Sequence, residues 1–272
     1  MSNKREKNMK GRVLIPLMIL MGWVILMVAS PYLSLNPNTI VLPNILAAPS
    51  FEAWLGFDDL GRPVWDRLAI GAKTSGLVAG AVIFISLILG TLIGTLSAWW
   101  GGWIERIIVH LMDVFLAFPG ILLAIALAGM LGPGIENVVI ALCVTGWIGF
   151  ARLARAQTLS LKQRDHVRSA KALGAGQTRI IFKHIIPLLT APMVIEATFG
   201  VASVVIAEAG LSFLGLGVQP PSASWGSMLR DGTSYMLVAP HLVIAPGLAL
   251  MAVVLSVNLL GDALRDYLDV KA

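Results

Sequence analysis

Three carboxylates lie within or beside the long apolar runs of this chain: Asp113, Glu196 and Glu208. A charge at membrane depth costs about 2.5 kcal/mol or more, so such groups usually face a cavity or a partner. Glu196 and Glu208 share one predicted helix, where their spacing separates them by about 120° in azimuth and about 18 Å along the axis. One site that uses both is therefore disfavoured. Of the two, Glu208 is the better candidate for lining a translocation path, although bonding to neighbouring backbone is favoured over that role.

The sequence contains no recognisable catalytic centre. Its four histidines lack the spacing of a metal site, and the single cysteine, Cys143, excludes an intramolecular disulfide. The segment Gly71-Ala72-Lys73-Thr74 imitates the end of a nucleotide-binding loop, but a glycine is missing upstream and an apolar run begins there. We therefore expect no catalytic residue, no metal, no cofactor bound by this chain, and no ATPase of its own.

The elements that must position these residues are membrane helices. The 272 residues are 57% apolar and 13% charged, with a mean hydropathy of +0.83, and the apolar residues form blocks of about 17–25, long enough to cross a bilayer. The predicted class is an all-α integral membrane protein. Its six expected transmembrane helices are 13–30, 74–99, 107–131, 135–151, 188–210 and 240–260.

The basic residues predict the orientation of these spans. With residues 1–12 in the cytoplasm, sixteen of the twenty Lys and Arg residues lie on the cytoplasmic side, as the positive-inside rule requires. Residues 31–72 then form an external segment, and the C-terminus is cytoplasmic. The pI near 9.6 could suggest nucleic acid, but basic residues beside apolar spans, without interleaved aromatics, favour membrane orientation and no nucleic-acid partner.

The longest polar run, 152–187, carries eight of the twenty basic residues. Within it, Val167, Ala170 and Leu173 recur at helical spacing, and Gly174 follows as a helix stop. A second short period ends at Pro187. We expect two short helices hinged at a glycine, which is typical of a docking element. A solvated loop on anionic lipid headgroups is the alternative.

This run resembles the EAA loop of ABC-importer permeases. The residues that match the loop's pattern are Ala170, Ala172, Leu173, Gly174, Ala175, Ile181, His184 and Pro187. Two positions depart from the pattern, because Arg168 stands where the family usually has glutamate and Ser169 replaces an alanine.

Two further stretches resemble the smaller permease subunit of the dipeptide/oligopeptide/nickel family. Residues 54–72 are similar to its external segment after the first span. Residues 208–226 resemble its signature, through Leu211, Ser212, Phe213, Gly215, Gly217 and Trp225. The resemblance covers roughly residues 50–270.

The resemblance implies a type I importer (MetI-like) fold with a permease core at 73–272. It also implies a second permease subunit, two ABC ATPase subunits that use ATP, and an external substrate-binding protein, in a bacterial inner membrane. Short peptides are the expected substrate, with nickel or a metal chelate as the alternative; a secondary transporter is less favoured because no inverted repeat is found. Coupling to the ATPase would involve Val167, Arg168, Ala170, Leu173, Gly174 and Ala175.

Overall fold

The computed structural model describes residues 2–51 and 53–269, and the side chains of 13–51 and 53–268. The last residues of the predicted cytoplasmic C-terminus, 270–272, lie outside them. The described chain is helical apart from its loops and one isolated bridge between Phe57 and Pro63. The elements are α1 (Ser2–Ala29), the 3-10 turn η1 (Leu42–Asn44), α2 (Val64–Trp100), α3 (Gly102–Leu116), α4 (Gly120–Leu131), α5 (Ile135–Leu161), α6 (Asp165–Ala172), α7 (Gln177–Ile180), the π-helix η2 (Ile181–Ile185), α8 (Ile186–Phe213), α9 (Trp225–Thr233) and α10 (His241–Asp269).

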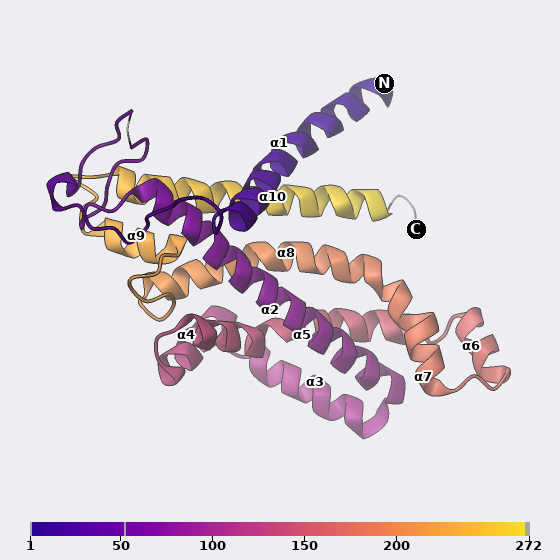
Figure 1. Cartoon of the computed structure of the whole chain (residues 1–272). Coiled ribbons are helices and arrows are strands. Elements are labelled where there is room, and N and C mark those ends of the chain that lie inside the picture. Colours follow the sequence, from indigo (N-terminus) through magenta and orange to yellow (C-terminus); the bar gives the residue numbers. More distant parts are fainter. Residues whose placement is uncertain (1, 52, 270–272) are drawn as a thin grey trace.

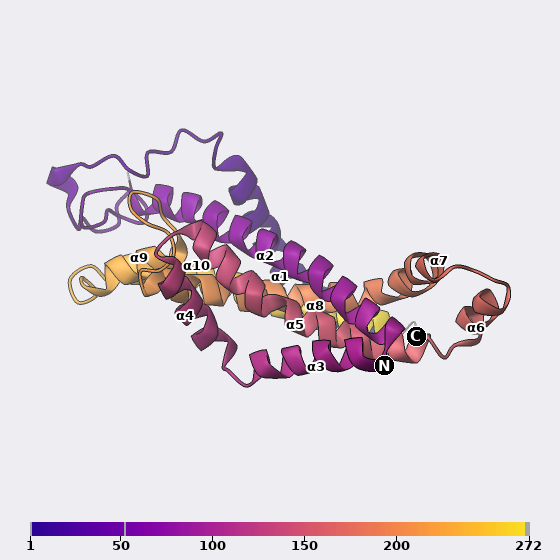
Figure 2. The same ribbon diagram turned by 90° about the horizontal axis from the view of Figure 1, so that it is seen from below.

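The helices form an elongated bundle with two distinct ends. Figures 1 and 2 both place α6, α7, the start of α1 and the end of α10 at one end. The segment 31–63, α4 and α9 lie at the opposite end in both views. The chain passes between the two ends repeatedly, so each end gathers residues that are far apart in the sequence.

The closest helix pair is α2 with α5, and glycines permit the approach. A Cβ built at Gly94 would overlap the backbone of Ala151, and one at Gly90 would lie 2.6 Å from the Cβ of Phe150. Small residues permit such a close approach in membrane bundles. Gly80, by contrast, has no atom within 4 Å of an added Cβ.

Fewer helices meet the requirements of a membrane span than the six that were predicted. Among the described residues, four helical stretches are long and apolar enough: Val64–Trp100, Ile135–Leu161, Gln177–Phe213 and His241–Leu268. The bent pair α3–α4 makes a fifth if it counts as one span, while the apolar part of α1, Val13–Ala29, is shorter. The structure therefore supports an all-α membrane protein with four to five candidate spans.

The predicted continuous span 107–131 is wrong. Helices α3 and α4 are separate and meet at an angle of 86°. The physical reason lies at Pro119, which has extended backbone (ψ 121°) immediately before α4. Proline lacks the N–H that a continuing helix would use and disfavours helical geometry at the preceding Phe118.

Two other boundaries also differ from the expectation. Helix α2 begins at Val64, directly after Pro63, about 15 Å of helix earlier than the expected start at residue 74. Helix α5 continues to Leu161, so the first part of the polar run 152–187 is helix rather than loop. Its apolar stripe persists through this polar region, because Ala151, Ala154, Thr158 and Leu161 are buried at helical spacing.

Candidate functional site

The first candidate site is the α6–α7 loop at one end of the bundle. Helix α6 stops at Gly174, whose φ of +79° is left-handed. The Gly174 N–H donates to the carbonyl of Lys171, and the Ala175 N–H to that of Ala170. This pair of bonds is a Schellman motif, which satisfies the last carbonyls of a helix. The predicted glycine stop is confirmed.

The residues predicted to couple to an ATPase fall into two groups in this loop. Val167 is 2% exposed and packs on Leu161, Ile180 and Ile185, so its side chain belongs to the core of the chain. Ala170 and Ala175 pack against the same cluster. These three residues hold α6 against α7 and the start of α8.

The other two side chains face outward. Leu173 is 87% exposed, and the exposed Arg168 donates one hydrogen bond to the side chain of Gln163 at 3.3 Å. Such a large exposed aliphatic side chain beside a left-handed turn is available to a partner. Arg168 and Leu173 are therefore the members of the predicted set that can meet another subunit directly.

Helices α7, η2 and α8 form one continuous helical stretch, Gln177–Phe213. The π-helical turn at Ile181–Ile185 lies immediately before Pro187. A proline cannot donate to the carbonyl four residues earlier, and a wider turn is one way to accommodate it. One uninterrupted helical stretch therefore joins the α6–α7 loop to the opposite end of the bundle.

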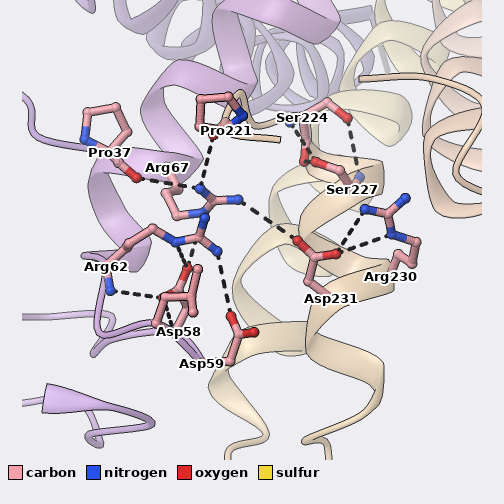
Figure 3. A network of polar contacts seen from close by, with 11 residues as sticks. Pro37, Asp58, Asp59, Arg62, Arg67, Pro221, Ser224, Ser227, Arg230 and Asp231 are labelled. Atoms are coloured by element: carbon pink, nitrogen blue, oxygen red, sulfur yellow. Dashed lines mark hydrogen bonds and ion pairs between the residues drawn. The ribbon is translucent and has the colours of Figure 1, made fainter. Parts of the chain in front are cut away.

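The second candidate site is a network of charges at that opposite end, shown in Figure 3. Asp58 accepts hydrogen bonds from Nε of Arg62 at 2.6 Å and from the backbone N–H groups of Leu60 and Arg62, each at 2.9 Å. Nε of Arg67 lies 3.4 Å from the same carboxylate. The turn from Asp58 to Arg62 is therefore closed around one nearly buried carboxylate.

Arg67 extends this network to the region of the predicted signature. Its Nη1 donates to the carbonyl oxygens of Pro37 at 3.4 Å and Pro221 at 3.5 Å, and its Nη2 lies 3.9 Å from Asp231. Figure 3 shows the guanidinium between these groups. One arginine thus connects three segments that are remote in the sequence.

Asp59 occupies the edge of the network. Burial, and secondarily the neighbouring negative charge of Asp58, raise the pKa of Asp59 above its ordinary value of 3.8. Its contact with Nη2 of Arg62 at 3.5 Å opposes this shift without cancelling it. The two adjacent aspartates therefore have different roles, because Asp58 is well paired and Asp59 is not.

Trp225 of the signature anchors α9 to α2. Its Nε1 donates to the carbonyl of Leu68 at 3.1 Å, and a Cβ added at Gly71 would lie 3.0 Å from its ring. Helix α9 begins with a reciprocal capping box between Ser224 and Ser227. The two stretches that carried the family resemblance, 54–72 and 208–226, therefore form one packed unit.

The remaining signature residues shape the turn after α8. Leu211 and Ser212 are fully buried, whereas Phe213 is 43% exposed. Gly215 has a φ of +83°, and a Cβ at Gly217 would overlap the Ser212 side chain. Packing and turn geometry therefore account for the residue types at these positions, and no ligand contact is needed to explain them.

Glu208 lies inside the bundle, away from the cavities that the structure describes. It is 1% exposed, and its two carboxylate oxygens accept hydrogen bonds from Ser75 and Ser212, both at 2.7 Å. Ser212 in turn accepts a bond from the backbone N–H of Val218. This placement favours a carboxylate that joins α2, α8 and the following turn. The sequence alternative of bonding to neighbouring backbone missed the serine on α2, which is far away in the chain.

Sequence reasoning also missed Asp231 and a cavity between α3 and α5. Asp231 showed no local signal, because its partner Arg67 lies on another element. Within the part of the chain that the structure describes, no group of three His, Cys, Asp or Glu side chains could hold a metal ion.

With this geometry in place, comparison with known proteins identifies the family. Residues 90–272 match the family described as "Binding-protein-dependent transport system inner membrane component". The match covers about two thirds of the chain, including the α6–α7 loop and the signature. The chain belongs to this family. It is a multi-pass permease subunit of an ABC importer, in which ATP hydrolysis takes place in partner ATPase subunits.

The permease is similar in sequence to two curated relatives over most of its length. It is 39% identical over 269 residues to the dipeptide transport system permease protein DppC of Alkalihalophilus pseudofirmus, covering 98% of this chain and 87% of the relative. It is 45% identical over 224 residues to the glutathione transport system permease protein GsiD of Pectobacterium atrosepticum, covering 82% of this chain and 74% of the relative. These relationships confirm the resemblance to the smaller permease subunits and exclude a secondary transporter.

A solved structure shares the fold of the permease. A chain of the methionine ABC transporter MetNI, in an inward-facing conformation, superimposes with a TM-score of 0.62 at 18% identity. The similarity covers 75% of this chain and 97% of that one. The expected MetI-like fold is confirmed.

Proposed function

We propose that this permease imports short peptides, as one half of a heterodimeric channel with a second permease subunit. The observation that carries the proposal is the 39% identity with a dipeptide permease over 98% of the chain. The relative named for glutathione supports the same class, because glutathione is itself a short peptide. An external binding protein would deliver the substrate, and two ATPase subunits would drive the cycle in a bacterial inner membrane.

The arrangement of the helices supports a six-crossing topology with both termini in the cytoplasm. Helix α1 begins at the α6–α7 end and is directed towards the opposite end, and the α3–α4 pair extends from one end to the other in Figure 1. The pair is bent, and the apolar part of α1, Val13–Ala29, is shorter than the four long spans. The segment 31–63, α4 and α9 would then lie at the external side, where the network around Asp58 shapes the surface.

The α6–α7 loop would be the contact with an ATPase subunit. Its projection from the bundle end in both views supports this role, as does the exposure of Leu173. The buried residues Val167, Ala170 and Ala175 would set the angle of α6, while Gly174 sets the turn. Motion of the loop would pass directly into α8, because α7, η2 and α8 are continuous.

The test is uptake in cells that lack their own peptide importers. Coexpression of the permease with its second subunit, ATPases and binding protein should give ATP-dependent uptake of labelled dipeptides or glutathione. Omission of the binding protein should abolish it. Nickel uptake without peptide uptake would overturn the peptide assignment in favour of the metal alternative.

A further inference from the structure

The side chain of Lys162 connects the start of the α6–α7 loop to the end of α2. Lys162 is the residue that follows α5, and the N-cap of α6, Arg164, lies shortly after it. Its Nζ donates hydrogen bonds to the backbone carbonyls of Ala98 and Trp99, each at 3.0 Å. These two residues belong to the last turn of α2, which ends at Trp100. The connection therefore joins positions that are 64 and 63 residues apart in the sequence.

The end of α2 lacks a cation of its own, and Lys162 supplies one. The last carbonyls of a helix have no N–H partner within it, and their partial negative charge favours a nearby cation. The chain leaves α2 at Gly101, whose φ of +68° is left-handed, so the regular hydrogen-bond ladder stops there. The last turn of α2 contains no basic residue. The residue type at position 162 is therefore explained by a helix end that belongs to another part of the chain.

Apolar packing brings the same two segments together. Trp99 packs against the buried cluster that includes Val167, Ile180 and Ile185. Ala170 of α6 packs against this cluster as well. The last turn of α2 is therefore linked to the α6–α7 loop in two ways, by the hydrogen bonds of Lys162 and by a shared apolar cluster.

Helix α2 leads from this contact to the opposite end of the bundle. It runs from Val64 to Trp100, a length of about 55 Å at 1.5 Å per residue. Arg67, in its first turn, belongs to the charge network around Asp58 that Figure 3 shows. The α6–α7 loop thus has two helical connections to that end: α8, which continues from it, and α2, to which Lys162 attaches it.

We propose that Lys162 is a positioning residue for energy coupling, which makes α6 move together with α2 when an ATPase subunit displaces the loop. The inference rests on the proposed function, in which the α6–α7 loop is the ATPase contact, and it adds α2 as a second route beside α8. The partners of the ammonium group are backbone carbonyls of this chain. Loss of Lys162 should therefore change how much transport each ATP drives, and leave the attachment of the ATPase intact.

A purely structural role is the alternative. The same two hydrogen bonds stabilise the end of α2, as basic side chains near a helix C-terminus do. Removal of a purely structural residue would lower the abundance of the permease, and uptake and ATP hydrolysis would fall in proportion. The coupling role predicts instead that the two rates separate in a permease of normal abundance.

The first experiment measures dialanine uptake and ATP hydrolysis together, in proteoliposomes that contain the complete importer and its loaded binding protein. Lys162→Met keeps a long side chain but removes the charge and both hydrogen bonds. It should lower the number of dialanine molecules imported per ATP about threefold or more, with unchanged ATPase copurification. Lys162→Arg keeps a charged donor and should retain most of the wild-type ratio. The matched control is Arg106→Gln, which removes an exposed basic residue shortly after the end of α2 and should keep the wild-type ratio.

An unchanged ratio in Lys162→Met would overturn the inference. Proportional loss of uptake and hydrolysis, a fall in permease abundance that accounts for the lost uptake, or an equal effect in Lys162→Arg or Arg106→Gln would overturn it as well. Failure of the wild-type importer to take up any peptide would instead contradict the proposed function.

The second experiment tests the attachment of α6 directly and does not depend on the transported substrate. Hydrogen–deuterium exchange of the purified complex reports how readily the backbone amides of α6 open. The amides of residues 167–173 should exchange severalfold faster in Lys162→Met than in wild type, and at the wild-type rate in Arg106→Gln. Amides of α9, at the opposite end of the bundle, serve as the internal reference. Equal exchange of α6 in wild type and Lys162→Met would overturn the inference, whatever the importer transports.

Discussion

Two buried carboxylates of this permease are satisfied by groups of the chain itself. Glu208 and Asp58 each accept two or more short hydrogen bonds from groups of the chain itself. The side chains of Asp113 and Arg152, by contrast, are exposed. A buried carboxylate that is fully hydrogen-bonded stabilises the fold. Glu208 and Asp58 are therefore structural carboxylates.

Glu208→Ala should destabilise the permease by about 1–3 kcal/mol, because it leaves the hydroxyl groups of Ser75 and Ser212 without their acceptor in a buried site. Glu208→Gln should be milder, since an amide can still bond to hydroxyl groups. The measurement is the thermal midpoint of the purified complex together with its abundance in the membrane, with exposed Glu136→Gln as control. Normal abundance and midpoint with lost uptake would instead assign Glu208 to the translocation path.

Replacement of the adjacent Asp58 and Asp59 by asparagine should affect the stability of the permease differently. Asp58→Asn should destabilise the permease by about 3 kcal/mol, because it breaks a nearly buried pair with Arg62 and leaves the guanidinium uncompensated. Asp59→Asn should be neutral or stabilising, since it removes a poorly paired charge. The measurement is the thermal midpoint at pH 7.5. Equal loss in both variants would contradict the assigned roles.

The raised pKa of Asp59 predicts a pH dependence. Protonated Asp59 is favoured in the folded state, so its stabilising contribution is present below the ordinary pKa of 3.8 and is lost as pH rises through the higher folded value. The advantage of Asp59→Asn over wild type should therefore grow between pH 4 and pH 7.5. Thermal midpoints across this range check the prediction, and a constant or shrinking difference would contradict it.

At the scale of elements, the α6–α7 loop is joined to α8 by continuous helix and by side-chain packing. The hinge is held by its own backbone bonds and by the cluster around Val167. The helix beyond it continues without a break to Glu208 and the external signature. A displacement of the loop by an ATPase subunit would therefore reach the opposite end through α8.

Gly174→Val should leave the permease in the membrane but weaken ATPase copurification and abolish uptake. A residue with a Cβ costs about 1–2 kcal/mol in the left-handed conformation, and β-branching adds to the strain. No atom lies within 4 Å of an added Cβ, so the effect comes from the backbone and not from a clash. Gly174→Ala should retain partial activity. Wild-type copurification and uptake in Gly174→Val would show that the loop is not the coupling element.

At the scale of the whole molecule, the two ends of the bundle carry different chemistry. One end presents the exposed loop with Arg168 and Leu173, and the other the network that joins 31–63 to α9. This separation is what an importer needs, because its ATPase and its binding protein act on opposite sides of the membrane.

The proposed six-crossing topology predicts the accessibility of single cysteines in a Cys143→Ser background. A cysteine at Phe51, which is 101% exposed, should react with a membrane-impermeant reagent added outside intact cells. One at Leu173 should react only after the membrane is opened, when the ATPase subunits are absent. Reaction of both cysteines in intact cells would contradict the topology.

Much of this permease follows from its sequence because the governing signals are local. Blocks of apolar residues predict membrane helices, and Gly174 after a short amphipathic period predicts the end of α6. The signature residues around Leu211 and Trp225 indicated the family without knowledge of their contacts. Each of these inferences depends on neighbours within a few turns of helix.

Tertiary structure alone decided the features that join distant segments. Pro119 is a local signal for a helix break, but the 86° bend between α3 and α4 does not follow from an apolar pattern that runs through it unchanged. Glu208 looked like a path residue until Ser75 of another helix was found beside it, and Arg67 meets Asp231 only after α9 folds onto α2. Whether a charge is paired depends on which helices pack together, and hydrophobic periodicity says which face of a helix is buried but not what lies against it.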